Sequence, residues 1–266
     1  MAISSVRSAG TYGAINRQNQ NQLAAYQERL SSGRRINKAA DDAAGLMTAK
    51  KLESLIRGSN KATDNADTMQ NALNVADGAL GSATESLNRM RELNVQSANG
   101  VYTDEDRAAM QMEVSQLTEH IDKMSSSVEF NKQKLLDGSF RNKIAGENPD
   151  GSGQQISVGD VSAKGLGIDN YDISSGTGMM SAMDSALEKI GFDRSKIGAQ
   201  YNGLESAANY NNINAENLEA GRSRIEDMDM NKGVLELVKE KAKQQYSMSV
   251  QKFQMQMAGM QLTLLV

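Results

Sequence analysis

Hydrophobic residues recur at alternating spacings of three and four along most of this chain. Between residues 66 and 90 the series runs without a break, which is the heptad pattern of an α-helix with one apolar stripe. Its members are Ala66, Met69, Leu73, Ala76, Leu80, Ala83, Leu87 and Met90. The pattern predicts a single long helix from about Asp42 to Asn99, ended by Asn99-Gly100.

Two further segments have the same spacing. One begins near Thr103, a good N-cap followed by acidic residues, and is expected to return antiparallel to the first helix. The other begins at Met179 and keeps its register to about Asp229, with polar residues at three register positions. The apolar positions are Met110, Val114, Leu117, Ile121, Met124 and Val128, then Met183, Leu187, Ile190, Ile197, Tyr201, Leu204, Ala208, Ala215, Leu218 and Ile225; the polar ones are Arg194, Asn211 and Arg222.

The two ends of the chain carry weaker apolar stripes. The first end, about Ser4 to Ser32, is predicted to be a helix that stops at Gly33, and the last, about residues 230–266, is amphipathic and rich in Met. Isolated helices are marginal in water, so we expect these ends to pair and to leave apolar surface for neighbouring copies. Such a contact, repeated without closing, generates a helical filament. The candidates for this polymerisation seam are Leu23, Leu30, Met248, Met255 and Leu262.

Residues 137–178 break the helical period and are rich in Gly, Ser, Asn and Asp. Ile156-Ser157-Val158 and Gly165-Leu166-Gly167-Ile168 predict one or two short strands joined by turns. The predicted fold class is therefore mainly α. We expect a long antiparallel helical bundle or coiled coil with paired terminal helices and a small insertion that contains a β-hairpin.

Composition supports long helices and argues against an enzyme. Of the 266 residues 39% are hydrophobic but only 4% aromatic, with no Trp and a single Pro, Pro149. The net charge of −4 is spread along the chain without a basic block for nucleic acid, and the absence of Cys excludes disulfides. No apolar run resembles a cleaved secretory signal or a membrane span. We found no nucleophile–base pair, phosphate loop or metal cluster, so no catalytic residue, cofactor or metal is expected.

Two polar features could indicate a metal site or acid–base catalysis, but structural roles are expected for both. His120, the one histidine, lacks a second ligand at helical spacing and is expected to face solvent, because Leu117 and Ile121 take the apolar seam. The pair Asp41-Asp42 precedes a helix and is expected to cap it or to adjust a subunit contact, rather than to act in acid–base catalysis.

Several long motifs occur in an order that closely resembles bacterial flagellin. The resemblance covers roughly residues 1–140 and 179–266. It departs from the family at Lys132, where a Gly usually follows the Phe-Asn pair, and near the C-terminus, which lacks the usual Pro. The motifs are Leu30-Ser31-Ser32-Gly33-Arg34-Arg35-Ile36-Asn37, Asp41-Asp42-Ala43-Ala44-Gly45-Leu46, Ile56-Arg57-Gly58, the stretch 87–100, Phe130-Asn131, Arg194-Ser195-Lys196-Ile197-Gly198-Ala199 and the stretch 223–229.

The resemblance implies a structural subunit that is exported by the flagellar type III apparatus and polymerises into an extracellular filament for motility. It implies an inner domain from residues 1–41 and 230–266, a helical rod from 42–140 and 179–229, and a short variable insertion at 141–178. The implied partners are other copies of the chain, an export chaperone, the filament cap and hook-associated proteins. Toll-like receptor 5 is a further candidate partner, through the positions that match Arg89, Leu93, Gln96 and Glu113. Ser174, Ser175 and Thr177 are candidate sites for O-linked sugars.

Two alternatives remain open from the sequence. A hook–filament junction protein shares the terminal helical plan but occurs as a single ring instead of thousands of copies. A coiled-coil adhesin or effector exported by the same apparatus would not polymerise.

Overall fold

The computed structural model describes residues 2–173 and 178–263, with side chains at 13–173, 180–257, 259 and 260. Ser174, Ser175 and Thr177, the candidate glycosylation sites, lie outside the described residues. The chain divides into two compact units. One consists of Met1–Ser54 with Asn217–Val266, and the other of Leu55–Glu216. Two long helices, α2 (Ala43–Ser97) and α5 (Gly178–Glu226), contribute to both units.

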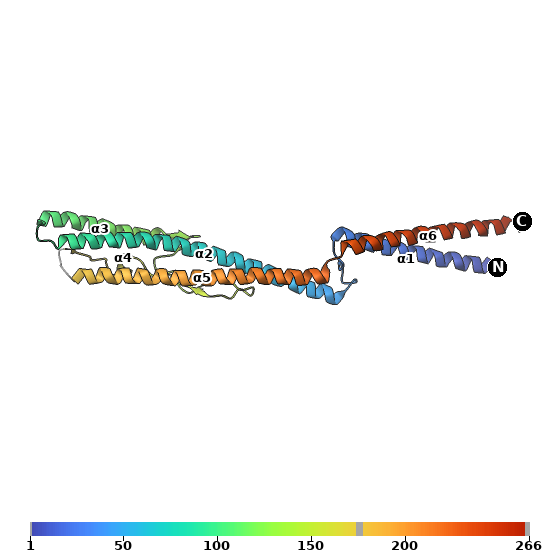
Figure 1. Cartoon of the computed structure of the whole chain (residues 1–266), viewed down its shortest axis with the longest axis horizontal. Helices are drawn as coiled ribbons and strands as arrows, with labels where there is room; N and C mark the ends of the chain where they lie inside the picture. The colour runs from blue at the N-terminus through green and yellow to red at the C-terminus, as the bar shows by residue number, and fades with distance from the viewer. Residues whose placement is uncertain (1, 174–177, 264–266) are drawn as a thin grey trace. The chain divides into compact units, whose positions relative to one another are not determined.

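The second unit is built on α2, α3 (Asp104–Ser127) and α5, which run side by side in Figure 1. Helix α3 returns antiparallel to α2 after a short turn, as predicted. The predicted heptad residues form the core: Leu80, Leu87, Val114, Ile121, Met183 and Leu204 are all fully buried. The mainly helical fold class is confirmed. The prediction succeeded because the apolar period of the sequence sets which face of each helix is buried.

The polar residues at heptad positions make specific contacts instead of apolar ones. Asn211 is buried and its Nδ2 donates a hydrogen bond to the backbone oxygen of Glu147 at 2.6 Å. The guanidinium of Arg194 donates to both carboxylate oxygens of Asp77, at 2.8 and 3.2 Å. These contacts join α5 to the middle segment and to α2 at defined places, which is how polar groups in a seam set its register.

Thr103 caps α3 as expected. Its hydroxyl accepts a hydrogen bond from the backbone N–H of Asp106 at 3.2 Å, and the Asp106 carboxylate accepts one from the Thr103 N–H at 3.0 Å. This reciprocal capping box satisfies two backbone donors that would otherwise lack partners at the helix start. The long α2 helix ends at Ser97, two residues before the predicted position.

The segment between α3 and α5, described over residues 128–173 and called the middle segment, contains two small antiparallel hairpins and a one-turn helix. Strand β1 (Glu129–Phe130) pairs with β2 (Gln133–Lys134), and β3 (Lys143–Ile144) pairs with β4 (Gln155–Ile156). The segment is packed and not a free loop, since its apolar side chains complete the core of the second unit. The buried members are Leu135, Leu136, Phe140, Ile156, Val158, Val161, Leu166, Ile168 and Tyr171.

One predicted strand is wrong and another is confirmed. Ile156 lies in β4, but Gly165-Leu166-Gly167-Ile168 belongs largely to helix α4 (Ala163–Leu166) and its cap. Ser162 caps this helix by accepting from the Gly165 N–H at 3.0 Å, and Gly167 ends it with a positive φ of 80°. An N-cap and a left-handed glycine three to five residues apart favour a helical turn over a strand.

The β1–β2 hairpin turns on two residues with left-handed backbone. Asn131 has φ 49° and Lys132 has φ 62°, and the pairing of Phe130 with Gln133 makes them a two-residue loop. Two-residue hairpin loops of this type favour Asn followed by Gly, because both residues need positive φ. Lys132 therefore holds a conformation that glycine adopts without steric strain.

Lys132→Gly is expected to stabilise the chain against unfolding. Left-handed backbone costs a residue with a Cβ about 1–2 kcal/mol, and part of the gain is offset by the greater flexibility of glycine when unfolded. We expect an increase of roughly 0.5–1 kcal/mol in the free energy of unfolding, measured by urea denaturation. Lys134→Gly, in the paired strand β2, is the control and should destabilise; equal effects from both changes would contradict the argument.

The first unit is built on α1 (Ala2–Ser32) and α6 (Met230–Thr263), which lie antiparallel. Helix α1 ends where predicted, because Gly33 takes a positive φ of 69°. The loop 34–42 then leads into α2, and α6 follows α5 after residues 227–229.

Candidate functional site

The contact between α1 and α6 is polar around Asn16, Asn19, Ser247 and Gln251. The amide Nδ2 of Asn16 donates to Gln251 Oε1, the Ser247 hydroxyl donates to Asn16 Oδ1 at 2.5 Å, and Asn19 Nδ2 donates to Ser247 Oγ at 3.4 Å. Because these amide and hydroxyl groups are partly buried and paired, they fix how the two helices face each other. We call this set, Asn16, Asn19, Ser247 and Gln251, the amide seam.

Near the loop the same helix pair becomes tightly packed and apolar. Gly233 of α6 is buried, and a Cβ there would lie 2.3 Å from Met228 Cε and 3.2 Å from Leu30 Cδ1. Glu240, also buried, accepts a hydrogen bond from Lys243 at 2.6 Å, and this bond raises the pKa of the Lys243 ammonium. Close packing at Gly233 anchors the pair at its base.

Most of the larger apolar side chains of α6 remain exposed in the helix pair. Tyr246 is 73% exposed, Phe253 63% and Met255 61%, although these are among the largest apolar groups of the helix. We call the exposed apolar residues of α6 the outer face. Its described members are Met230, Val234, Leu235, Val238, Tyr246, Met248, Phe253, Met255, Met257 and Met260. Large exposed apolar surface of this kind marks a site of protein association.

The five seam candidates fall into three groups. Leu23 and Leu30 are half-buried on α1, towards the middle and end of the helix. Met248 and Met255 lie on the outer face, at 41% and 61% exposed. The side chain of Leu262 lies outside the described side chains, although its backbone belongs to α6.

The α1–α6 pair is strongly basic compared with the rest of the chain. The two helices carry eight Lys or Arg residues and three Glu, a net charge of +5. Since the whole chain has a net charge of −4, the remainder carries −9. Like charges on neighbouring pairs would repel, but at physiological ionic strength the Debye length of about 8 Å screens most of this repulsion.

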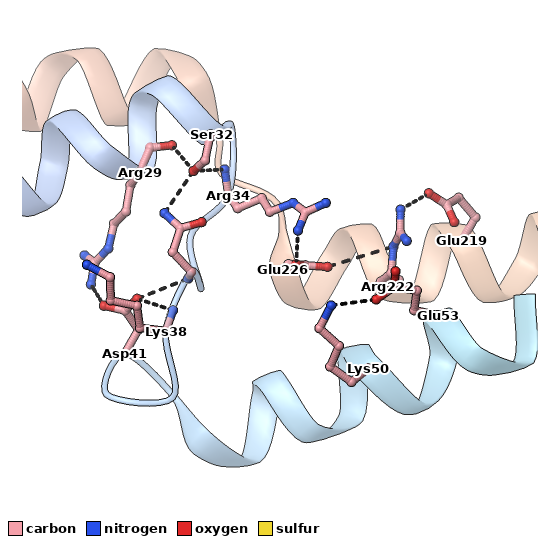
Figure 2. A network of polar contacts seen from close by, with 11 residues as sticks. Arg29, Ser32, Arg34, Lys38, Asp41, Lys50, Glu53, Glu219, Arg222 and Glu226 are labelled. Carbon is pink, nitrogen blue, oxygen red and sulfur yellow. Dashed lines mark hydrogen bonds and ion pairs between the residues drawn. The ribbon is translucent and has the colours of Figure 1, made fainter. Parts of the chain in front are cut away.

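A polar network fills the corner where α1 ends and α5 passes into α6 (Figure 2). The carboxylate of Glu226, 6% exposed, lies 2.9 Å from Arg34 Nη1 and 3.9 Å from Arg222 Nε. The backbone closes the same corner, since the Arg35 N–H donates to the Glu226 oxygen at 2.7 Å and the Met228 N–H donates to Gly33 at 2.9 Å. A buried carboxylate held by two guanidiniums is costly to break on one side only.

Of the two neighbouring aspartates, Asp42 caps a helix as predicted, whereas Asp41 has a different structural role. Asp42 caps α2, because its Oδ1 accepts from the Gly45 N–H at 2.8 Å. Asp41 instead closes the loop before α2: it accepts from Arg29 Nη2 at 2.6 Å and from the backbone N–H groups of Asn37 and Lys38, each at 3.1 Å. The Arg29 hydrogen bond, followed by the two backbone bonds, lowers the pKa of Asp41 to about 2.

This loop is expected to loosen in acid. A carboxyl whose pKa falls on folding, here from 3.8 to about 2, stabilises the fold above pH 3.8, and that contribution is lost as the pH falls through about 2. The amides of Asn37 and Lys38 should therefore lose hydrogen-exchange protection between about pH 4 and pH 2. In Asp41→Asn the two amides should be less protected at every pH, and their protection should no longer change across this window. A wild-type profile that stays flat down to pH 2 would contradict the role of Asp41.

The four candidates for receptor recognition, Arg89, Leu93, Gln96 and Glu113, lie on α2 and α3 in the second unit. Arg89 Nε donates to Glu113 Oε1 at 2.7 Å and Arg89 Nη1 lies 3.2 Å from Glu92; these bonds, that to Glu113 first, raise the Arg89 pKa. Gln96 Nε2 donates to the Tyr102 hydroxyl at 2.9 Å. Leu93 is only 2% exposed and belongs to the core, so it supports this face from below instead of lying on it.

The amide seam and much of the outer face were not predicted from sequence. Asn16 and Asn19, and Ser247 and Gln251, are three and four residues apart, so heptad spacing of polar residues was the available signal. Tyr246 and Phe253 are seven residues apart, as are Met248 and Met255, and both pairs face outwards. Met248 and Met255 were predicted from the sequence but Tyr246 and Phe253 were not, and periodicity alone could not say which side of α6 meets α1.

Residues 2–173 and 178–263 contain no cluster of three or more His, Cys, Asp or Glu side chains able to hold a metal ion. His120 is exposed on α3, as expected. Within the same ranges, none of the helices has the length and apolar character needed to span a bilayer.

Two family models match most of the sequence. The bacterial flagellin N-terminal helical region matches residues 3–141, and the bacterial flagellin C-terminal helical region matches residues 180–264. Together, the two matched regions include the helices that form the amide seam, the corner network and the core of the second unit.

Individual proteins are similar over the same extent. The flagellar filament 33 kDa core protein of Treponema phagedenis is 37% identical over 233 residues, which span 80% of this chain and 81% of that protein. Flagellin of Bacillus subtilis strain 168 is 35% identical over 268 residues, or 85% and 87% of the two chains. A Vibrio parahaemolyticus structure described as a hook-associated protein superposes with a TM-score of 0.55 at 16% identity, covering 70% of this chain and all of that one; this likeness concerns the fold alone.

Proposed function

The chain belongs to the bacterial flagellin family, and from this premise we propose that the outer face of α6 is the surface through which its copies assemble. Like other members of this family, the chain is a structural subunit of the flagellar filament and not an enzyme. Assembly into a filament gives it its role in motility.

The exposure of the outer face is the observation that supports this proposal. Within the pair, α1 covers the polar side of α6, and Tyr246, Phe253 and Met255 stay more than 60% exposed. Apolar area removed from water stabilises a contact by roughly 25 cal/mol per Å², so covering these side chains favours association. Only surfaces repeated on every copy can satisfy every subunit of a growing polymer.

We assign the parts of the chain to layers of the filament on the same basis. Residues 1–41 and 230–266 would form the inner domain, 42–140 and 179–229 the helical rod, and 141–178 the short insertion. In support, the amide seam and outer face lie in the terminal segments, whereas the core cluster lies between residues 66 and 208. The polymerisation seam would then consist of Leu23, Leu30, Met248, Met255 and Leu262 together with the outer face.

The remaining partners follow from the family role. We propose that the chain is exported by the flagellar type III apparatus with the help of a chaperone that covers its terminal helices. It would then join the extracellular filament beneath the cap, next to hook-associated proteins. The large apolar surface of α6 supports this, because an uncovered face of this kind needs a partner before assembly.

Toll-like receptor 5 is a second candidate partner, at the exposed ion pairs of Arg89. The guanidinium of Arg89 is about half exposed and pairs with Glu113 and Glu92, and Gln96 follows two turns later on the same helix. Arginine is often a dominant contact in protein interfaces. Arg89→Ala is therefore expected to weaken binding of the receptor ectodomain by about tenfold in surface plasmon resonance. Lys123→Ala, which removes an exposed cation of α3, should leave binding unchanged; equal loss in both variants would contradict a specific site.

Seeded growth tests the main proposal directly. Purified monomer is added to short filament fragments, and growth is followed by light scattering and electron microscopy. We expect tubes that lengthen in proportion to added monomer, with thousands of copies per filament, which also separates a filament subunit from a single-ring junction protein. An intact chain that stays monomeric under these conditions would overturn the proposal.

A further inference from the structure

Methionine is concentrated on the outer face of α6. Met248 is 41% exposed, Met255 61%, Met257 43% and Met260 56%. The methionines of the second unit's core, Met90 and Met183, are by contrast fully buried. Among the described methionines, five of the seven that are exposed lie on the outer face, the surface assigned to assembly; Met47 and Met112 are exposed elsewhere.

Resting on the proposed function, we propose that Met248, Met255 and Met257 form a reversible oxidation site that blocks assembly of the free subunit. The oxidant class is a peroxide. With hydrogen peroxide, the O–O bond breaks, one oxygen forms an S=O bond with the thioether, and the other leaves as water. Sulfur loses two electrons and the peroxide gains them. The reaction stops at the sulfoxide, which methionine sulfoxide reductases return to the thioether.

A sulfoxide changes the outer face from apolar to polar at the points that must be covered. Its oxygen is a strong hydrogen-bond acceptor, and burying such a group against an apolar neighbour without a partner is unfavourable. Each subunit contact would then lose apolar burial and gain an unsatisfied polar group. We expect roughly tenfold slower growth for each sulfoxide that falls in a contact.

The same geometry makes the site specific to the unassembled state. Once a neighbouring subunit covers the outer face, the peroxide can no longer reach these sulfur atoms. Met112 on α3 is 63% exposed but belongs to the second unit and not to the outer face, and so serves as an internal comparison. Oxidation would therefore act on subunits before assembly and spare those already in a filament.

The test treats full-length monomer and preassembled filaments in parallel with hydrogen peroxide. Peptide mass spectrometry then measures sulfoxide at each methionine, and seeded growth measures assembly. In the monomer, Met248, Met255 and Met257 should be oxidised at least tenfold faster than Met90 and Met183, and growth should fall about tenfold or more. In filaments the three should be protected, and reductase treatment of oxidised monomer should restore growth.

Two sets of variants separate this effect from general damage. The triple change Met248→Leu, Met255→Leu and Met257→Leu keeps an apolar surface but removes the three thioethers of the proposed site, so its growth should survive peroxide, whereas Met112→Leu should remain sensitive. Met255→Gln, which imitates the polarity of a sulfoxide, should slow growth without any oxidant, and Met112→Gln should not. Normal growth of oxidised wild-type monomer, equal peroxide sensitivity of the triple variant, or normal growth of Met255→Gln would each overturn the proposal. If untreated monomer failed to grow from seeds, the proposed assembly function itself would fail, and this inference with it.

Discussion

A chain that lacks residues 233–266 is expected to form no filaments while its second unit stays folded. The deletion removes nearly all of α6, including Gly233, half of the amide seam and most of the outer face. The core cluster of the second unit lies wholly between residues 66 and 208, so none of its side chains is lost. Seeded growth should be undetectable, and circular dichroism should keep the helical signal and cooperative unfolding of the remaining chain.

A point variant makes the same test without removing a helix. Met255→Lys places a charge on the outer face, whereas Gln256→Lys adds the same charge one residue later at an exposed polar position. Losing the burial of one Met side chain amounts to about 1.5–3 kcal/mol per contact, so the critical concentration should rise roughly tenfold or more for Met255→Lys. Gln256→Lys should grow nearly as the wild type does. If the two variants grew equally well, or if the truncated chain formed tubes, α6 could not carry the assembly contact.

Leu87→Ala is expected to destabilise the second unit more than any surface change in it. Leu87 is fully buried near the C-terminal end of the α2 heptad, in the core cluster to which α2, α3 and α5 contribute. Shortening a buried Leu to Ala removes apolar contacts and leaves a cavity, which typically lowers stability by 2–5 kcal/mol. Urea denaturation followed by circular dichroism measures this loss as a shift of the midpoint at unchanged slope.

Asn88→Ala provides the matched control for Leu87→Ala. Asn88 is the next residue of α2 and is exposed, so its shortening should change stability by less than about 0.5 kcal/mol. A loss below about 1 kcal/mol for Leu87→Ala would show that the three-helix interior is not closely packed at this level.

The heptad helices could be predicted from the sequence because their signal is local and repeated. Ala66 to Met90 gives eight consecutive seam positions, and a polar residue at any one of them would stand out. Thr103 and Gly33 mark helix ends by equally local chemistry. The interior of the second unit follows from these stripes, since three long helices have few ways to bury one stripe each.

The middle segment was harder to predict because its structure depends on distant contacts. The side chain of Gln111 on α3 binds the backbone of residues 171–173. It donates to the Tyr171 oxygen and accepts from the Ile173 N–H, each at 2.9 Å. Asp122 accepts from the Ala163 N–H at 2.6 Å and so helps to start α4. No periodicity within residues 137–178 encodes these contacts. The Gly165–Ile168 strand prediction overlooked the local caps of α4, Ser162 and Gly167, and could not include the distant Asp122.

The orientation of α6 was not predictable either, because its apolar residues are spread around the helix. Its sequence places Leu235, Val238 and Met248 on different sides, and the amides that meet α1 also follow a heptad. A pattern with apolar groups on several sides is expected for a helix that is covered from several directions. The pairing of Asn16 with Gln251 and Ser247 shows which side belongs to α1.

That pairing controls the chemical identity of the surface shown to other molecules. If the register of α6 against α1 shifted by one residue, the side of α6 that meets α1 would change by about 100°, since the helix has 3.6 residues per turn. Asn16 and Asn19 would then lose Gln251 and Ser247, and a different set of groups would be presented outside. Four uncharged, partly buried side chains between the two helices thus fix one alignment of α6 on α1, and with it the set of apolar side chains that every copy exposes.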